Sequence, residues 1–365
     1  MEKPQPFKKW VSIVAVIGFL AFLSYLFFFT DFTEVEVVIG GTNVPVYFLA
    51  FAAEIVTVVF DALAWRAILN ALGETIGFWR MFELTWVGIF IDTLIPGGWV
   101  GDLSKTYLVT VEDKVRGPKA LAAIIIKDVL ELFFILGSLL IGVVFLVSLY
   151  SINGVLMTAV VITLLFLSLP LVLIIVLALN LRATEKLLNL VYKVVGKIKG
   201  EETGKSLTEK TKKQIQDFHD GLVLMRQNPR GIIKPAAYQI TSGIFSVLIL
   251  LFVFYALGTN IGFDKVLITN TVIVIIQGQG VVLAGFSQVV FSTLYTVLGI
   301  APALSIASSL LEGFAGFWFR LVVSFGYFEL IVAEKCVPFF CRKCGGWISW
   351  GKKSCDDPVL NDGRK

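Results

Sequence analysis

Charge is scarce in this chain: Asp, Glu, Lys and Arg make up 16% of its 365 residues, against roughly a quarter of an ordinary soluble domain. Histidine is nearly absent, with His219 as the single copy in a polar stretch. The sequence also lacks a glycine-rich phosphate loop ending in Lys-Ser or Lys-Thr, and it lacks a His-Glu-x-x-His motif. We therefore expect neither an enzyme nor an ATP-driven pump, and no cofactor.

Apolar residues, in contrast, make up 57% of the chain and gather in long uncharged runs, at 10–29, 152–181 and 235–257. Each run can cross a hydrocarbon core of about 30 Å, which takes about twenty helical residues. Continuous runs rather than ten-residue alternation favour helices over a barrel. The run 10–29 ends in bulky Phe residues, so we interpret it as a retained helix rather than a cleaved signal peptide. The fold class expected is an all-α polytopic membrane protein.

Basic residues indicate which loops face the cytoplasm, because cytoplasmic loops collect Lys and Arg. All but three of the 31 basic residues lie in five segments: 1–9, 66–80, 101–119, 182–234 and 334–365. Segment 30–44 has three acidic residues and no basic one. We expect a multi-pass protein of the cell membrane with both termini in the cytoplasm.

This topology predicts two re-entrant hairpins. The apolar segment 81–95 lies between two cytoplasmic segments, so it must enter and return, with Pro96, Gly97 and Gly101 at its tip. Segment 266–298 must likewise enter and return from outside, with its tip near 277–280 or Gly285. About six full spans and two hairpins then form an inverted repeat, with halves 1–150 and 151–333, as in secondary transporters. The alternative is that the hairpins are ordinary full helices and some basic loops face out.

Two segments do not belong to the predicted spans of the transmembrane domain, 1–333. The insert 182–234 is too polar to cross a membrane, and its apolar stripes suit an amphipathic helix. It lies either at the cytoplasmic headgroups or against the membrane domain. The tail 334–365 contains Cys336, Cys341, Cys344 and Cys355. Four thiols at this spacing predict either a structural zinc site or an unstructured tail with reduced thiols.

Ionisable residues inside spans are costly and are therefore functional candidates. Lys127 and Glu131 are four residues apart and can pair on one helix face, beside Asp128. The other candidates flank the hairpins or share a helix face: Asp92, Asp102 and Lys105; Glu312 and Arg320; Glu54 and Asp61. As substrate-binding residues we select Asp102, Lys105, Lys127, Glu131, Glu312 and Arg320. The alternative is that such pairs only hold helices together.

The stretches GIFIDTLIPGGWVGDLSKTYLV and ALAAIIIKDVLELFFIL resemble the lysylphosphatidylglycerol synthase transmembrane, or flippase-like, family over about residues 5–330. That family has a Pro-x-x-x-Gly-Asp-x-x-Arg hairpin, then a helix with an Arg and an Asp four residues on. Here Gly101 and Asp102 follow Pro96 one residue later than usual, and Lys105 replaces the Arg. Lys127 and Glu131 stand for the Arg and Asp. The second hairpin keeps Gly285 but lacks the family's Pro and Glu.

The resemblance implies translocation of an anionic or polyprenyl-phosphate-type lipid between leaflets, with membrane lipids as partners. No segment has the size of an aminoacyltransferase domain, so aminoacyl transfer is not implied. Two alternatives stay open: a non-transporting membrane subunit of a lipid-modifying glycosyl- or aminoacyltransferase, and a small-solute secondary transporter. Nothing predicts a nucleic-acid partner.

Overall fold

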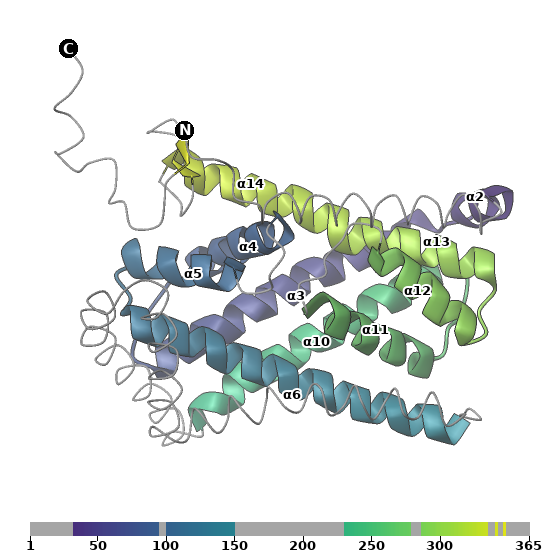
Figure 1. Ribbon diagram of the computed structural model, residues 1–365, viewed down its shortest axis with the longest axis horizontal. Coiled ribbons are helices and arrows are strands. Elements are labelled where there is room, and N and C mark those ends of the chain that lie inside the picture. The colour runs from purple at the N-terminus through teal and green to yellow at the C-terminus, as the bar shows by residue number, and fades with distance from the viewer. Residues whose placement is uncertain are drawn as a thin grey trace, which may run out of the picture.

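The computed structural model describes residues 32–94, 100–149, 230–278, 286–334, 340–341 and 346–347. This part is helical apart from one two-residue antiparallel ladder (Figure 1). Its elements are α2 (Phe32–Gly40), α3 (Val44–Ala71), α4 (Phe78–Leu94), α5 (Val100–Val111), α6 (Gly117–Leu149), α10 (Arg230–Ala256), α11 (Phe263–Gly278), α12 (Phe286–Val297), α13 (Pro302–Gly313), the π-helix η1 (Phe314–Trp318), α14 (Phe319–Glu334), β1 (Phe340–Cys341) and β2 (Gly346–Trp347). The predicted first span, the run 152–181 and residues 182–229 of the predicted insert lie outside the described residues. The predicted insert extends to residue 234, but residues 230–234 form the start of α10.

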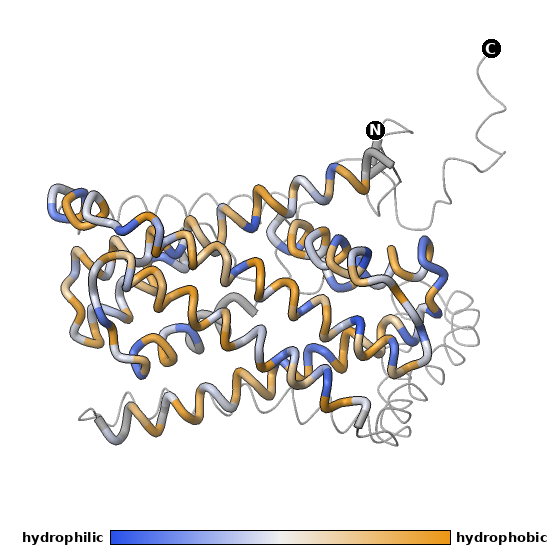
Figure 2. The backbone as a smooth tube through the Cα atoms, turned by 180° about the vertical axis from the view of Figure 1, so that it is seen from behind, coloured by the Kyte–Doolittle hydropathy of each residue, from blue (hydrophilic) through white to orange (hydrophobic). Residues whose placement is uncertain are grey.

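Three segments of this part are long and apolar enough to cross a membrane: Val44–Ala71, Gly231–Ala256 and Pro302–Ile331. Hydrophobic residues run along the helices, and hydrophilic ones gather at turns, at helix ends and at a few interior positions (Figure 2). Large apolar side chains cover the outside of the bundle, such as Phe48, Val322 and Leu330, each more than half exposed. A surface of this kind suits lipid rather than water, so the chain is a helical membrane protein.

The centre of the fold is the crossing of α3 and α10, which run antiparallel (Figure 1). The Ser242 hydroxyl donates to the Thr57 carbonyl across this crossing at 3.1 Å. The first residue before α3 also meets the last residue of α10, since the Asn43 N–H donates to the Ala256 carbonyl at 2.7 Å. Asn43 caps α3 as well, because its side-chain oxygen accepts from the Val46 N–H.

The helices α4 and α5 form a pair in which the N-terminal end of α4 lies beside the C-terminal end of α5. Arg80, in the first turn of α4, forms ion pairs with Glu112 and Asp113, which directly follow α5. The two helices touch at glycines farther along. A Cβ on Gly101 would overlap the Asp92 carboxylate and the Gly88 carbonyl, and one on Gly88 would lie 2.5 Å from the Lys105 side chain. The chain therefore returns to the end from which α4 started.

The second half repeats the first at a constant spacing. The N-terminal residues of α4 and α6, Phe78 and Gly117, recur 185 positions later as those of α11 and α13. The same spacing separates the C-terminal ends of α3 and α10, and those of α6 and α14. Two residues with positive φ, Gly73 and Lys114, match Gly258 and Gly299 at that spacing. The remaining matched ends deviate from this spacing by one residue: both ends of α5 and α12, the N-terminal ends of α3 and α10, and the C-terminal ends of α4 and α11.

Contacts between helices repeat in the same way. The helix α4 packs on α14, and its counterpart α11 packs on α6. The contact of α6 with α10 has its counterpart in the contact of η1 with α3. Close approach at α6 depends on small residues, because a Cβ on Gly243 would overlap the Phe134 ring. Figure 1 shows the resulting arrangement, with α6 and α13–α14 on opposite sides of the crossing.

Candidate functional site

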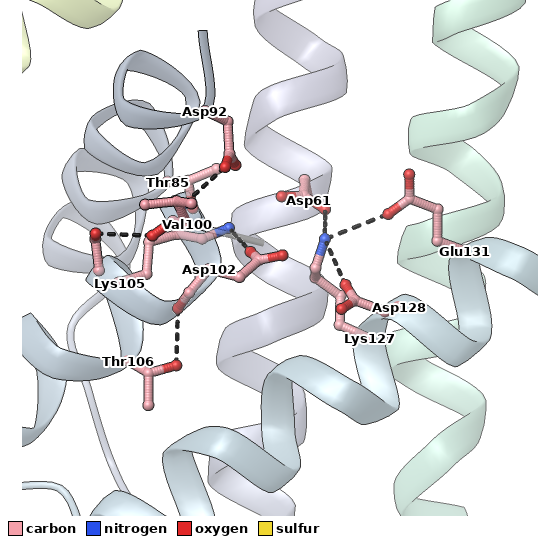
Figure 3. A network of polar contacts seen from close by, with 12 residues as sticks. Asp61, Thr85, Asp92, Val100, Asp102, Lys105, Thr106, Lys127, Asp128 and Glu131 are labelled. Atoms are coloured by element: carbon pink, nitrogen blue, oxygen red, sulfur yellow. Dashed lines mark hydrogen bonds and ion pairs between the residues drawn. The ribbon is translucent and has the colours of Figure 1, made fainter. Parts of the chain in front are cut away.

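Lys127 of α6 is the centre of a buried ionic cluster (Figure 3). Its ammonium lies 3.1 Å from Asp61 of α3, 3.5 Å from Asp128 and 3.3 Å from Glu131. The residue is only 6% exposed, so these carboxylates replace the water that a lysine would otherwise require. The predicted pair of Lys127 and Glu131 is thus present, but Asp61 is the closer partner and joins two helices.

A second lysine enters the same region from α5. Lys105 forms an ion pair with Asp102, three residues earlier, and its ammonium lies 5.6 Å from the centre of the Trp65 ring. Both Lys105 and Trp65 are buried. The Trp65 indole N–H has no hydrogen-bond partner in the described part of the chain. This region therefore contains the ammonium groups of Lys105 and Lys127 and, on the Trp65 ring, an N–H donor without a hydrogen-bond partner.

The break between α4 and α5 brings a further carboxylate to this cluster. Asp92, near the end of α4, accepts a hydrogen bond of 2.6 Å from the Gly101 N–H, in the first turn of α5. A carboxylate at the start of a helix is favoured by the helix dipole. Of the residues predicted at the hairpin tips, Gly101 is in the first turn of α5, whereas Pro96, Gly97 and Gly285 lie outside the described residues. We call Asp61, Asp92, Asp102, Lys105, Lys127, Asp128 and Glu131 the lysine cluster.

The arginine cluster, Glu54, Glu312 and Arg320, lies farther along α3. Two guanidinium nitrogens of Arg320 bind the two carboxylate oxygens of Glu54, with Nη2 at 3.1 Å from Oε2. Glu54 is completely buried. Glu312 is eight residues before Arg320, but the π-helix η1 lies between them, and no ion pair joins the two in the structure. Glu312 and Arg320 were predicted to lie on roughly one face, and the structure adds that Arg320 pairs with Glu54, which joins α14 to α3.

Acidic residues outnumber basic ones in these two clusters. The cations are Lys105, Lys127 and Arg320, and the carboxylates are Glu54, Asp61, Asp92, Asp102, Asp128, Glu131 and Glu312. Within the described residues, no three His, Cys, Asp or Glu side chains are arranged to hold a metal ion. The clusters can bind and release charged groups, but they contain no evident nucleophile with its base.

The sequence carried a signal for the α3 residues that the site prediction did not use. Glu54 and Asp61 are seven residues apart and share a helix face, as expected. The structure adds that each binds a cation from the last span of a different half, Arg320 and Lys127. Charged residues buried in apolar spans must be paired, and the surplus of acids on α3 was the available hint.

The predicted zinc site stays a prediction. Cys341 ends β1, which pairs with β2 in an antiparallel ladder. The other three cysteines, Cys336, Cys344 and Cys355, lie outside the described residues.

Residues 10–324 match the sequence profile of the lysylphosphatidylglycerol synthase TM region. The chain is also 21% identical to a UPF0104 membrane protein of Pyrococcus horikoshii, over 74% of this chain and 82% of that protein. A UPF0104 membrane protein of Methanothermobacter thermautotrophicus is 21% identical over 80% of this chain and 88% of its own length. No solved structure matches the chain. The resemblance drawn from the hairpin motif is thereby confirmed, and the chain belongs to the family of the lysylphosphatidylglycerol synthase TM region.

Proposed function

We propose that this protein moves a phosphate-bearing lipid between the two leaflets of the cell membrane. The observation that carries the proposal is the lysine cluster beside the α4–α5 pair, in which both lysines are buried. It places two ammonium groups and the Trp65 N–H in the interior of an apolar bundle. Charged groups at that depth are costly and mark transport pathways in membrane proteins.

The architecture proposed is an inverted repeat with two re-entrant helix pairs. The link from Arg80 to the residues after α5 supports entry and return at one face. The spacing of 185 residues and the matched contacts support the repeat. In this arrangement both termini face the cytoplasm.

In this mechanism the lipid headgroup crosses along the lysine cluster while the acyl or prenyl chains stay in the bilayer. A phosphate can accept from the ammonium groups of Lys105 and Lys127 and from the Trp65 N–H. The headgroup has to displace carboxylates that now hold those ammonium groups. Glu131, with a side chain 43% exposed, is the most accessible of the three around Lys127. Glu131 is therefore the partner we expect to leave first.

The full pairing of Lys127 favours one competing function, a membrane subunit that anchors a lipid-modifying enzyme. A core of satisfied ion pairs needs no ligand. In that case the cluster is structural, and the protein moves no lipid by itself.

Reconstitution in liposomes separates the two functions. The rate at which a fluorescent phospholipid with one phosphate becomes accessible to an added quencher measures its movement. Lys127→Arg keeps the charge and should keep lipid movement. Removing the closest pair with Lys127→Gln/Asp61→Asn should give a folded protein, judged by gel filtration and thermal unfolding, that moves lipid no faster than empty liposomes. Arg116→Gln, at a side chain 76% exposed, is the control. Undiminished lipid movement by the folded double variant would refute the proposal.

A further inference from the structure

Lys127 and Glu312 occupy the same position in the two halves. Lys127 is the eleventh residue of α6, and Glu312 is the eleventh residue of α13, 185 positions later. The two halves thus place opposite charges at one site of a repeated framework. The charge at this site is balanced by neighbouring side chains in the first half but not in the second.

In the first half the ammonium of Lys127 is matched by carboxylates of the chain itself. In the second half Glu312 has no ion pair among the described residues, because the Arg320 guanidinium binds Glu54. The Glu312 carboxylate lies over Gly316, where a Cβ would be 2.8 Å from its Oε1. The arginine cluster therefore contains two carboxylates and one guanidinium, which leaves one negative charge without a counter-ion inside the bundle.

Two buried hydroxyl groups lie together near this charge. Tyr295 of α12 is 1% exposed, and its hydroxyl lies beside that of Thr269 of α11 and within electrostatic reach of Glu312. Neither hydroxyl oxygen makes a hydrogen bond of regular geometry in the described part of the chain. Buried hydroxyls normally find a partner, so two such oxygens near an unpaired carboxylate indicate a missing ligand.

The remaining groups around Glu312 supply no positive charge. Tyr47 of α3 donates its hydroxyl to the Leu311 carbonyl at 2.6 Å. The amide of Gln288, from α12, lies against Gly313. Helix α2, which packs on α13, brings only the exposed Glu34 and Glu36. The face of α10 that packs here is apolar, with Ile249 and Val253 against Leu311.

From these observations we propose that Glu312 binds one exchangeable monovalent cation, a proton or a sodium ion. One uncompensated negative charge calls for one positive charge, and carboxylate and hydroxyl oxygens without His or Cys suit a hard cation. Carriers with broken helices bind coupling ions in such places. In the transport cycle proposed above this cation would be the coupling ion, but its binding does not depend on lipid movement.

The test uses the purified full-length protein in detergent. Binding of radioactive sodium is measured at pH 8, and thermal unfolding is followed while sodium replaces N-methylglucamine at constant ionic strength. A ligand that binds only the folded state raises the unfolding temperature. If the cation is sodium, the wild type should bind about one equivalent and unfold a few degrees higher, whereas Glu312→Gln should do neither.

If the cation is a proton, sodium has no effect, and the wild type should take up about one more proton than Glu312→Gln when a weakly buffered sample is titrated from pH 9 to pH 5. Glu312→Gln removes an uncompensated charge and should fold, and Glu34→Gln on the exposed α2 should behave as the wild type. Equal sodium binding and equal proton uptake by wild type and Glu312→Gln would overturn the proposal. This result leaves lipid movement, measured separately in liposomes, untouched.

Discussion

Arg320 of α14 binds Glu54 of α3 through two guanidinium nitrogens and so joins residues that are 266 positions apart in the chain. The pair fixes the last span of the second half to the central helix of the first. Glu54 is completely buried, while the Arg320 side chain is 36% exposed. Loss of the arginine would therefore leave a carboxylate that water cannot reach.

Arg320→Gln should lower the free energy of unfolding by about 3 kcal/mol, the lower end of the range for breaking a buried ion pair, because the guanidinium is partly exposed. Arg320→Gln/Glu54→Gln should recover most of this loss, since the completely buried side chain at position 54 then carries no charge. Thermal unfolding of both variants in detergent measures the difference. A double variant as unstable as the single one would show that the pair is held by packing and not by charge.

Gly101→Ala should destabilise the α4–α5 pair, because its Cβ would overlap the Asp92 carboxylate and the Gly88 carbonyl. Overpacking of this kind typically costs about 1–3 kcal/mol. Gly137→Ala in α6 is the matched control, since its Cβ would meet no atom within 4 Å. The same substitution there should be neutral, or stabilising by up to about 1 kcal/mol. Comparison of the two unfolding midpoints tests the close crossing.

Cysteines introduced at Gly97 and Gly285 should react more slowly with a membrane-impermeant maleimide than one at Glu36, which is in α2 and exposed. The predicted topology puts the hairpin tips within the bilayer and Glu36 outside it. The four native cysteines are first replaced by serine. Rapid labelling at Gly97 from outside, at the rate of Glu36, would contradict the first re-entrant pair.

The purified protein should contain about one equivalent of zinc if the four tail cysteines form a site, and Cys341→Ser should abolish it. Four thiolates are the commonest ligand set of structural zinc. Metal analysis combined with thiol titration decides the question. Metal-free protein with four titratable thiols would establish the alternative, a tail without a metal site.

Sequence reasoning recovered the membrane class, the family and the pair Lys127–Glu131, because each rests on local signals: apolar runs, a hairpin motif and a spacing of four residues. It did not recover the ion pairs that connect distant helices. Asp61 and Arg320 find their partners only when α3 is packed against the last spans, and no spacing in the sequence encodes that contact.

The sequence contains a direct sign of the repeat in the turns that follow α3 and α10. The turn after α3 runs Ala-Leu-Gly-Glu-Thr-Ile-Gly-Phe from Ala71, and the turn after α10 runs Ala-Leu-Gly-Thr-Asn-Ile-Gly-Phe from Ala256. Both turns contain a glycine with positive φ, Gly73 and Gly258, which explains why that residue type is kept. Hydropathy and charge counts do not detect such a match, whereas comparison of the chain with itself does.

The two acids of α3 and the arginine that binds one of them belong to different halves of the chain. This distribution limits which halves can associate with each other. The α10 counterparts of Glu54 and Asp61 are the uncharged Gln239 and Ser246. A dimer of two first halves would bury both acids of α3 twice and supply no Arg320, and a dimer of two second halves would supply the arginine without its acid. Two copies of the same half therefore cannot balance the charges that they would bury. Separately expressed halves should associate only as unlike partners, in a ratio of one to one.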